Sequence, residues 1–169
     1  MHRIWNGGRD HHRTGLILVN ELENSDEVAQ QIYQEMLDRI CVAYEMRDFD
    51  CFARMINVPH TIFGFGPTTT LNDHSDLREV FDGTCTFLAT KAVTDHIRTC
   101  LVATFTASDE IDCMHETRML CGAHVLEHPY PVQSILRRIN GEWAVCRSYI
   151  ALDPNVGMGR ILHKTTGHA

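Results

Sequence analysis

The chain has 169 residues, of which 44% are apolar, and it carries a formal net charge of −7. A chain of this length and composition fits one globular domain with a core large enough to fold alone. The acidic balance comes without a run of Lys or Arg, which argues against a nucleic-acid-binding protein. The longest apolar run near the N-terminus, Leu16 to Val19, is too short for a signal peptide or a membrane span, so we expect a cytoplasmic protein that does not contact a membrane.

The first part of the chain divides into a polar arm and a long helix. Residues 1–23 show no periodicity and contain Gly7-Gly8, so we expect an N-terminal arm there. Asn24 and Glu27 resemble a capping box, which predicts that a helix begins at this point. Apolar residues then recur at helical spacing, which extends the amphipathic first helix through Val28, Ile32, Met36, Ile40 and Tyr44.

Two shorter helices are predicted to follow, with a pair of short strands between them. Asp48 is placed to cap the second helix, and Pro59 is placed to stop it. Residues 60–73 read as a strand, a Gly-Pro turn and a second strand. Asp73 or Ser75 can cap the third helix. Its expected buried stripe consists of Leu77, Val80, Phe81 and Leu88.

From residue 93 onward the apolar pattern has a period of two, which predicts strands over 94–107, 110–125, 131–139 and 142–152. The turns between them are expected at Ser108-Asp109 and Asn140-Gly141, the latter being a strong hairpin signal. Three helices followed by a meander of strands predict an α+β domain over residues 24–152, with one face of the sheet covered by the helices. Residues 153–169 are expected to form a C-terminal tail.

Cysteine and histidine are frequent, but their spacing does not match a known metal motif. The seven cysteines include no CxxC pair, and the eleven histidines include no HExxH or Cys/His knuckle. Most of the cysteines lie in apolar segments, which favours reduced thiols acting as small hydrophobic side chains. We therefore predict no metal site and no organic cofactor.

Three stretches carry a resemblance to a known family: "AYEMRDFDCFARMI", "TDHIRTC" and "RRINGEWAV". Their order and spacing resemble those of the nuclear transport factor 2-like superfamily, and within it the SnoaL-like group, over about residues 26–152. The resemblance implies a curved antiparallel sheet of about six strands wrapped around three N-terminal helices, forming a cone with an internal pocket. Such a fold hosts isomerases, dehydratases, cyclases, dioxygenase subunits and binding modules, so the fold alone does not specify a function.

The strand register sorts the side chains of the first long hairpin into two faces. If Ala107 pairs with Glu110, strict alternation continues along both strands. In SnoaL-like proteins the histidine of the second motif points into the cone, which implies that His96 and, by register, His115 do so here. The same face is then expected to carry Arg98, Cys100, Val102, Thr104, Cys113, Thr117, Met119 and Cys121.

His96 is the first catalytic candidate, because an imidazole that titrates near neutral pH in a partly apolar pocket can act as a general acid or base. The alternative is a core histidine held by a hydrogen bond. The resemblance places Glu45 where relatives carry an aspartate that could orient His96, although Glu45 could equally be a solvated carboxylate. Ile40 stands where dehydratase-like relatives have a tyrosine, unless Tyr44 or Tyr33 takes its place.

The remaining predicted pocket residues come from the family's strand parity. It implies that Gln133, Arg137 and Ser148 face the cone, together with Cys100 and Thr117, and that Trp143, Arg147 and Tyr149 face away. Arg137 could hold an anionic substrate group or could be a solvated strand end. Phe63 and Phe65 are expected to line the pocket wall and to serve binding and packing alike. By the same parity, Ile135, Ala144, Cys146 and Ile150 are also expected to point inward.

Two functional hypotheses follow. The first is an enzyme without a cofactor that uses His96, Glu45 and His115 in the dehydration, isomerisation or cyclisation of a small, cyclic or polyketide-like molecule. The second is a non-catalytic ligand-binding or assembly protein, such as a subunit similar to the small subunit of ring-hydroxylating dioxygenases. An apolar outer sheet face, through which a homodimer or homotrimer could form, favours the second. That face is expected to present Ile97, Leu101, Ala103 and Phe105.

Overall fold

A computed structural model describes residues 11–164 of the chain, with side chains for residues 25–162. Within this part of the chain the helices are α1 (His11–Met46), α2 (Phe49–Met55), α3 (His74–Thr90) and α4 (Gly157–Lys164). The strands are β1 (Ile56–Gly64), β2 (Thr69–Leu71), β3 (Asp95–Ala107), β4 (Glu110–Cys121), β5 (His124–Val125), β6 (Tyr130–Ile139) and β7 (Glu142–Ile150).

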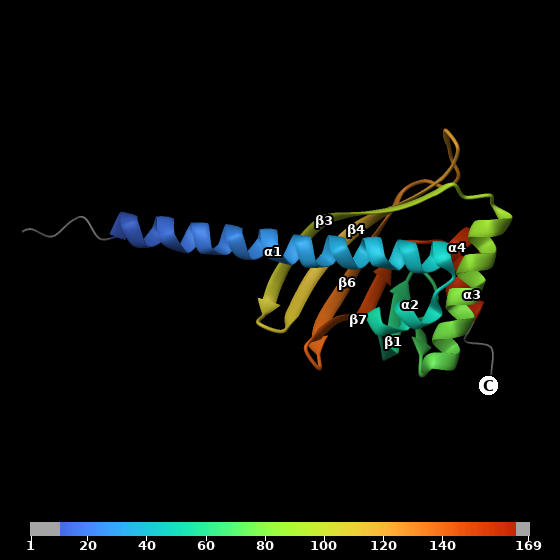
Figure 1. Cartoon of the computed structure of the whole chain (residues 1–169), viewed down its shortest axis with the longest axis horizontal. Helices are drawn as coiled ribbons and strands as arrows, with labels where there is room; N and C mark the ends of the chain where they lie inside the picture. The colour runs from blue at the N-terminus through green and yellow to red at the C-terminus, as the bar shows by residue number, and fades with distance from the viewer. Residues whose placement is uncertain (1–10, 165–169) are drawn as a thin grey trace, which may run out of the picture.

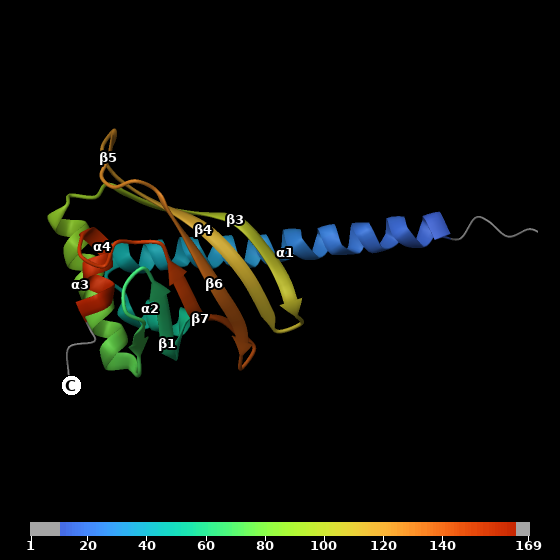
Figure 2. The same ribbon diagram turned by 180° about the vertical axis from the view of Figure 1, so that it is seen from behind.

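The strands form one curved sheet whose concave face is covered by α1, and α3 and α4 pack together at one end (Figures 1 and 2). The strand order is β2-β1-β7-β6-β4-β3, with β5 paired to β4. The α+β cone predicted from the sequence is confirmed. The sheet is mixed rather than wholly antiparallel, because β1 runs parallel to β7. Among the described residues, no helix has the length and hydropathy required to cross a membrane.

The predicted helix caps are present, but some helix ends differ from expectation. Asp48 accepts a hydrogen bond from the Cys51 amide at 2.9 Å, and Asp73 caps α3. The second helix already ends at Met55, so Pro59 lies inside β1 rather than at a helix end. The first helix begins at His11, well before the expected cap at Asn24, and part of the expected tail forms α4.

The exposed edge of the sheet is covered by a side chain of α1. The strand β3 stands at the end of the strand order, so one row of its backbone groups has no neighbouring strand. The Gln34 amide donates to the Arg98 carbonyl at 3.0 Å, and the Cys100 amide donates to the Gln34 side-chain oxygen at 2.8 Å. Gln34 thus forms the two hydrogen bonds that a neighbouring strand would form with this edge. These bonds fix α1 beside Arg98.

Irregularities in two strands overturn part of the predicted facing. The turn at Ser108-Asp109 is confirmed by the pairing of Ala107 with Glu110, but the register shifts between Cys100 and Val102. A bulge of this kind reverses the alternation beyond it. The expected outer residues Ala103 and Phe105 therefore lie inside, against the core, and the expected inner residues Val102 and Thr104 are exposed.

The closing hairpin contains a second register shift. Its Asn140-Gly141 turn is confirmed, but Ile135 pairs with Arg147 while the neighbouring Leu136 pairs with Val145, which leaves Cys146 as the extra residue. On β6 the buried residues are Tyr130, Val132, Ser134 and Leu136, so Gln133, Ile135 and Arg137 face outward, contrary to expectation. On β7, Trp143 packs inward, 6.0 Å from the Phe105 ring, whereas Ala144 alternates to the outer face opposite Arg137 and Val145 takes the inward place.

Candidate active site in the cone

A cavity of about 100 Å³ lies between α1 and the concave face of the sheet. Apolar side chains from all layers of the fold form most of its wall. Its polar lining is small, and among the described residues it contains no Asp or Glu. An apolar cavity with a few convergent polar groups is the usual form of a small-molecule site. The polar lining consists of Tyr33 and Tyr44 from α1, His60 from β1, Arg98 from β3, His115 from β4 and Ser148 from β7.

The shortest polar contact in the cavity joins Tyr33 and His115. The Tyr33 hydroxyl oxygen lies 2.5 Å from His115 Nδ1, and both side chains are buried. Burial lowers the pKa of His115 to about 3, and the nearby Arg98 charge adds to this effect. Burial also raises the pKa of Tyr33 above its usual value. At neutral pH the pair is therefore a neutral imidazole bonded to a neutral phenol.

Arg98 brings a permanent positive charge to the same cavity. Its guanidinium carbon lies 5.6 Å from the centre of the Tyr44 ring, close enough for a cation–π contact. The Nε atom is sealed from solvent and has no hydrogen-bond partner. The strand pattern predicts Arg98 on the inner face but indicates no role for it, because the absence of an acidic partner is visible only in three dimensions.

His60 is a polar cavity residue that sequence reasoning missed. Its Nε2 atom lies 3.2 Å from Ser148 Oγ, across the parallel pairing of β1 and β7. Burial lowers the pKa of His60 to about 4, so this histidine is also neutral at pH 7. The available signal was the alternation along β1, in which His60 and Ile62 fall on one face. Ser148 lines the cavity from the position that the sequence predicted.

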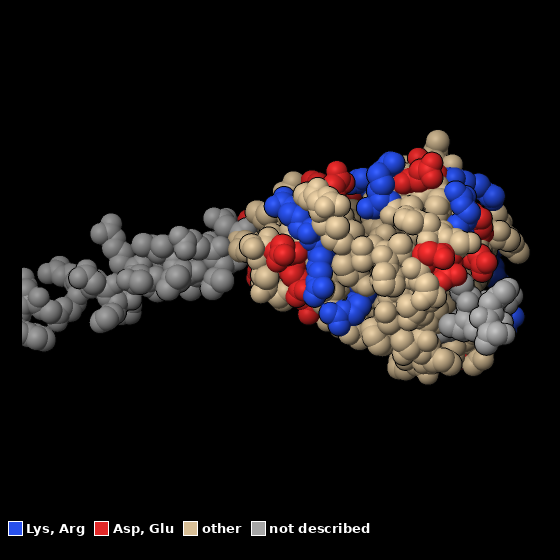
Figure 3. Space-filling model, turned by 90° about the horizontal axis from the view of Figure 1, so that it is seen from below, with Lys and Arg blue, Asp and Glu red and all other residues tan. Residues whose placement is uncertain are grey.

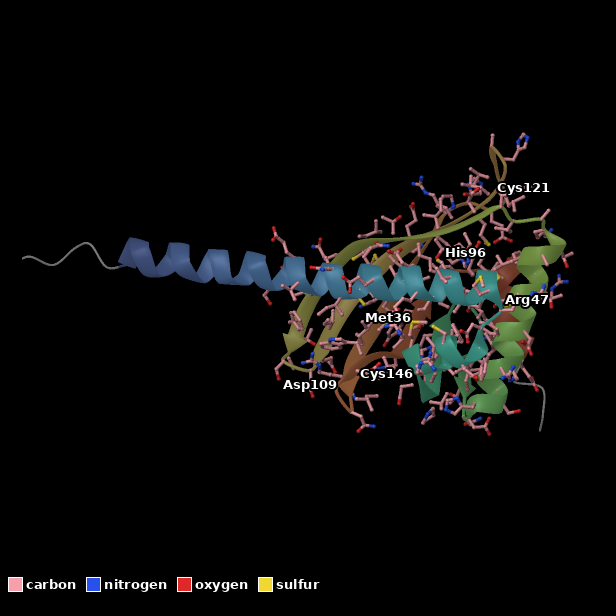
Figure 4. The ribbon with its side chains drawn as sticks, in the orientation of Figure 1. Met36, Arg47, His96, Asp109, Cys121 and Cys146 are labelled. Atoms are coloured by element: carbon pink, nitrogen blue, oxygen red, sulfur yellow. The ribbon has the colours of Figure 1, made fainter. Side chains whose placement is uncertain are left out.

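The predicted catalytic residues His96 and Glu45 line a neighbouring cleft rather than the cone cavity. This cleft has a volume of about 510 Å³ and also includes Cys41 and Tyr44. His96 lies at the start of β3, near the C-terminal part of α1 and far from the turn marked by Asp109 (Figure 4). The structure gives no hydrogen bond between His96 and Glu45, and His96 Nδ1 has no partner. Burial, with a contribution from Arg98, lowers the pKa of His96 to about 3, so the expectation of titration near neutral pH is wrong.

The other predicted pocket residues fall into two groups. Ile40 and Tyr44 line the cavity, whereas Cys100 and Thr117 point inward without lining it. Phe63 and Phe65 instead lie on the outer face: Phe63 stacks on Tyr149 at 4.8 Å, and Phe65 is 79% exposed.

Gln133 and Arg137 also lie on the outer face. Gln133 donates to the Asp112 carboxylate at 2.9 Å, and Arg137 pairs with Glu110 at 2.8 Å. The bulge at Cys146 explains why the parity argument failed here, since it assumed an unbroken alternation through both strands. Arg137 is therefore not a cavity cation.

The described residues offer no ready-made metal centre. No group of three or more His, Cys, Asp and Glu side chains is arranged to hold an ion within the part of the chain that the structure covers. The cysteines there are free thiols. The chemistry that the site can perform with its own residues is proton transfer at neutral imidazoles beside one guanidinium.

Comparisons with solved structures identify the fold. The chain is similar to a protein of unknown function from Mycobacterium tuberculosis, with 15% identity, a TM-score of 0.58, and 94% of this chain and 92% of that chain covered. It is also similar to an NTF2-like protein of unknown function from Pseudomonas putida, with 13% identity, a TM-score of 0.55, and coverage of 76% and 89%. A third similar structure is LinA, with 11% identity, a TM-score of 0.55, and coverage of 75% and 86%.

These likenesses show that the chain has the cone fold of the nuclear transport factor 2-like superfamily, as the sequence motifs predicted. At identities this low they show the fold and not the activity. No protein-family model matches the chain, and no curated protein matches it significantly. The function must therefore be argued from the site.

Proposed function

We propose that the protein binds a small, largely apolar cyclic molecule in the cone cavity and moves a proton on it, in an isomerisation, dehydration or cyclisation. The observation that carries this proposal is the buried Tyr33–His115 contact in the wall of an apolar cavity that also contains Arg98. Geometry of this kind unites an acid-base group, a partner that orients it, and a cation that can stabilise developing negative charge.

The tautomer of His115 determines what its second nitrogen can do. When Nδ1 carries the proton, it donates to the Tyr33 oxygen, and Nε2 has a free lone pair that can accept a proton from a carbon acid. The resulting imidazolium returns that proton from Nε2 to another carbon of the same molecule, so the protein ends unchanged. The enolate formed between the two transfers is negative, and Arg98 is the only cation in the described lining of the cavity.

This proposal can be tested with a probe of one ring, 3-cyclohexenone, whose double bond moves into conjugation when a proton is transferred. The measurement is the rise of ultraviolet absorbance, with deuterium incorporation from D2O as a second readout. We expect His115→Gln to lower the rate by roughly 10²- to 10⁴-fold, the range for general acid–base groups. Tyr33→Phe should lower it less, because the imidazole loses only its orienting partner.

A matched control is His124→Gln, because His124 lies in β5 and is exposed. This variant should keep the wild-type rate. If the probe binds, as shown by calorimetry, and His115→Gln isomerises it as fast as the wild type, His115 is not the proton-transfer group.

His96 with Glu45 remains our second candidate pair. Tyr44 lines both the cone cavity and the cleft that contains these two residues, so its side chain forms part of the wall between the two spaces. His96→Gln belongs in the same assay. A rate loss with His96→Gln that equals or exceeds the loss with His115→Gln would move the catalytic centre to the cleft.

The alternative function is non-catalytic ligand binding or assembly, as in a dioxygenase-like structural subunit. It is supported by apolar side chains on the outer sheet face, where Ile97, Leu101 and Val102 are 42%, 54% and 46% exposed. These replace the predicted set, since Ala103 and Phe105 lie inside. A homodimer or homotrimer through this face would bury them. A monomer in light scattering at micromolar concentration would remove the basis for assembly.

A further inference from the structure

The cone cavity contains a positive charge that the described chain does not compensate. Arg98 is the only permanently charged side chain in the described lining, and its Nε has no partner. The salt bridges of the described residues are Glu116–Arg118 and Glu110–Arg137, both on the outer face of the sheet. A guanidinium stays protonated at any physiological pH, so the charge is permanent.

The groups that surround Arg98 are neutral at pH 7. Tyr33, Tyr44 and Tyr130 are the phenols whose electrostatic interaction with Arg98 is largest, and burial raises the pKa of each, in Tyr130 to about 12. Burial also raises the pKa of the Cys41 thiol. The histidines on the same face, His96 and His115, have lowered pKa values and are uncharged. None of these side chains can therefore serve as the counter-ion.

An isolated charge inside a protein is costly, because the interior solvates it far less well than water does. The usual remedies are a paired carboxylate or a bound ion, and the described residues contain no such partner for Arg98. We propose that Arg98 is the anion-binding group of the cone and that the natural occupant of the cavity is a small monocarboxylate with an apolar body. This inference rests on the proposed ligand cavity, adds the chemical class of its ligand, and gives Arg98 the role of holding that ligand's carboxylate, in the place that the enolate of an uncharged substrate would take.

A carboxylate fits these surroundings better than other anions do. The guanidinium is a planar fork that matches a carboxylate through two parallel hydrogen bonds, and the unpartnered Nε lies on one edge of that fork. A monoanion neutralises the single charge, whereas a phosphate dianion would leave a negative charge in the same poorly solvated space. The remaining wall suits an apolar body, because it includes Leu37, Ile62, Leu77, Val80 and Val132.

The sequence suggested an anion-binding arginine at a different place. Arg137 was the predicted candidate, but it pairs with Glu110 on the outer face and has its counter-ion already. Arg98 shares the inner face of β3 with His96 and Cys100, and all three are half-buried. The anion-binding role expected of Arg137 is therefore better supported for Arg98.

Calorimetry with three one-ring probes tests the proposal: benzoate, its neutral isostere benzamide, and phenyl phosphate. We expect the wild-type full chain to bind benzoate roughly 10- to 100-fold more tightly than benzamide, as for a charge-assisted hydrogen-bonded pair. Phenyl phosphate should bind more weakly than benzoate. Arg98→Met should abolish the preference for benzoate over benzamide, and Arg98→Lys, which keeps the charge but lacks the fork, should reduce it.

The control is Arg118→Met, which removes an outer-face arginine of the same strand pair and should bind the probes as the wild type does. Thermal unfolding supplies a second measurement. Without ligand, Arg98→Met should unfold at the wild-type temperature or above it, because an unpaired buried charge is removed. Benzoate should raise the unfolding temperature of the wild type and not that of Arg98→Met.

Several results would overturn the proposal: equal affinity for benzoate and benzamide, no binding of either, tighter binding of phenyl phosphate, or a benzoate preference that survives in Arg98→Met. Equal affinity of the wild type for benzoate and benzamide, together with His115-dependent isomerisation, would refute this inference alone. A preference for benzoate without His115-dependent isomerisation would refute the proposed function alone.

Discussion

The two faces of the curved sheet differ in how their charged side chains are paired. On the outer face, acidic side chains have partners: Glu116 bonds Arg118 at 2.7 Å, and Asp112 accepts from Gln133 at 2.9 Å. The inner face carries histidines, phenols and one arginine, without a carboxylate in the described lining of the cavity. On the side of the molecule seen in Figure 3, basic and acidic side chains are interspersed, with uncharged surface between them.

This contrast indicates where in the fold a polar group without a hydrogen-bond partner is costly. A charge pair in water contributes little, so the outer face can exchange partners at small cost. A polar group inside the cone has few neighbours that can solvate it, so each unpartnered atom there is destabilising. Unpartnered atoms are nevertheless found at His60 Nδ1, His96 Nδ1 and Arg98 Nε, the last two on the inner face of β3. Destabilising features of this kind concentrate where a protein binds a ligand or performs chemistry.

The largest expected effect is a loss of stability in mild acid. The pKa of His60 is lowered to about 4, and those of His96 and His115 to about 3, from an ordinary value of 6.5. Below pH 6.5 the unfolded chain binds protons that the folded chain does not, so the free energy of unfolding falls as the pH falls towards 4. Each histidine then lowers the free energy of unfolding by about 1.4 kcal/mol per pH unit. Three histidines acting independently lower it by roughly 4 kcal/mol per pH unit.

The measurement is the urea midpoint between pH 7 and pH 5, above the range in which most carboxylates titrate. The Arg98 charge contributes to the low pKa of His96 and His115, so in Arg98→Met the loss of stability should level off at a higher pH, while the slope between pH 7 and pH 5 stays close to that of the wild type. His60→Gln should remove the contribution of one proton. A midpoint that does not change over this range would contradict the buried, neutral state of these histidines.

The second effect compares neighbouring residues of β6 that point to opposite faces. Leu136 is fully buried, whereas the Arg137 side chain is 53% exposed. We expect Leu136→Ala to lower the free energy of unfolding by about 3 kcal/mol, because it leaves a cavity in the core. Arg137→Ala should leave the urea midpoint close to the wild-type value. Similar losses in both variants would contradict the facing of β6.

A smaller effect is expected at the edge of the sheet. Gln34→Ala removes the two hydrogen bonds that cover the β3 edge, and we expect a loss of about 1–2 kcal/mol. Hydrogen exchange should show the Cys100 amide losing protection more than the amides of β6 do. Gln31→Ala is the matched control, because Gln31 bonds Glu35 on the exposed side of the same helix.

Local signals in the sequence were sufficient for the order of the elements from α1 to β7, apart from the short β5, and for several exact ends. The caps Asp48 and Asp73 act within three residues of their own position, and the Asn140-Gly141 turn needs only its own backbone conformation. The start of α1 was missed, because no cap or periodicity marks residues near His11. The strand predicted over 110–125 ends at Cys121, since Gly122 has φ +58 and opens a turn.

The face on which each strand side chain lies, and the contacts between distant residues, could not be predicted from local signals. A single bulge after Cys100 reversed the predicted faces of Ala103 and Phe105, and a bulge leaves no distinct mark in an apolar alternation. The Tyr33–His115 contact joins residues 82 positions apart, from a helix and a strand. The missing partner of Arg98 is a property of its whole surroundings, which a sequence pattern does not contain.

The smallest expected effect concerns the outer ion pair between Glu116 and Arg118. Both residues lie in β4 at the surface, with side chains that are 30% and 56% exposed, so water screens their attraction. We expect Arg118→Ala to change the free energy of unfolding by at most about 0.5 kcal/mol, with the difference vanishing at high salt. Arg98→Met, on the opposite face of β3, should show no such salt dependence in its ligand-free stability. An outer-pair effect as large as that of Leu136→Ala would mean that a partner or further chain covers this face, because only desolvation makes a surface pair strong.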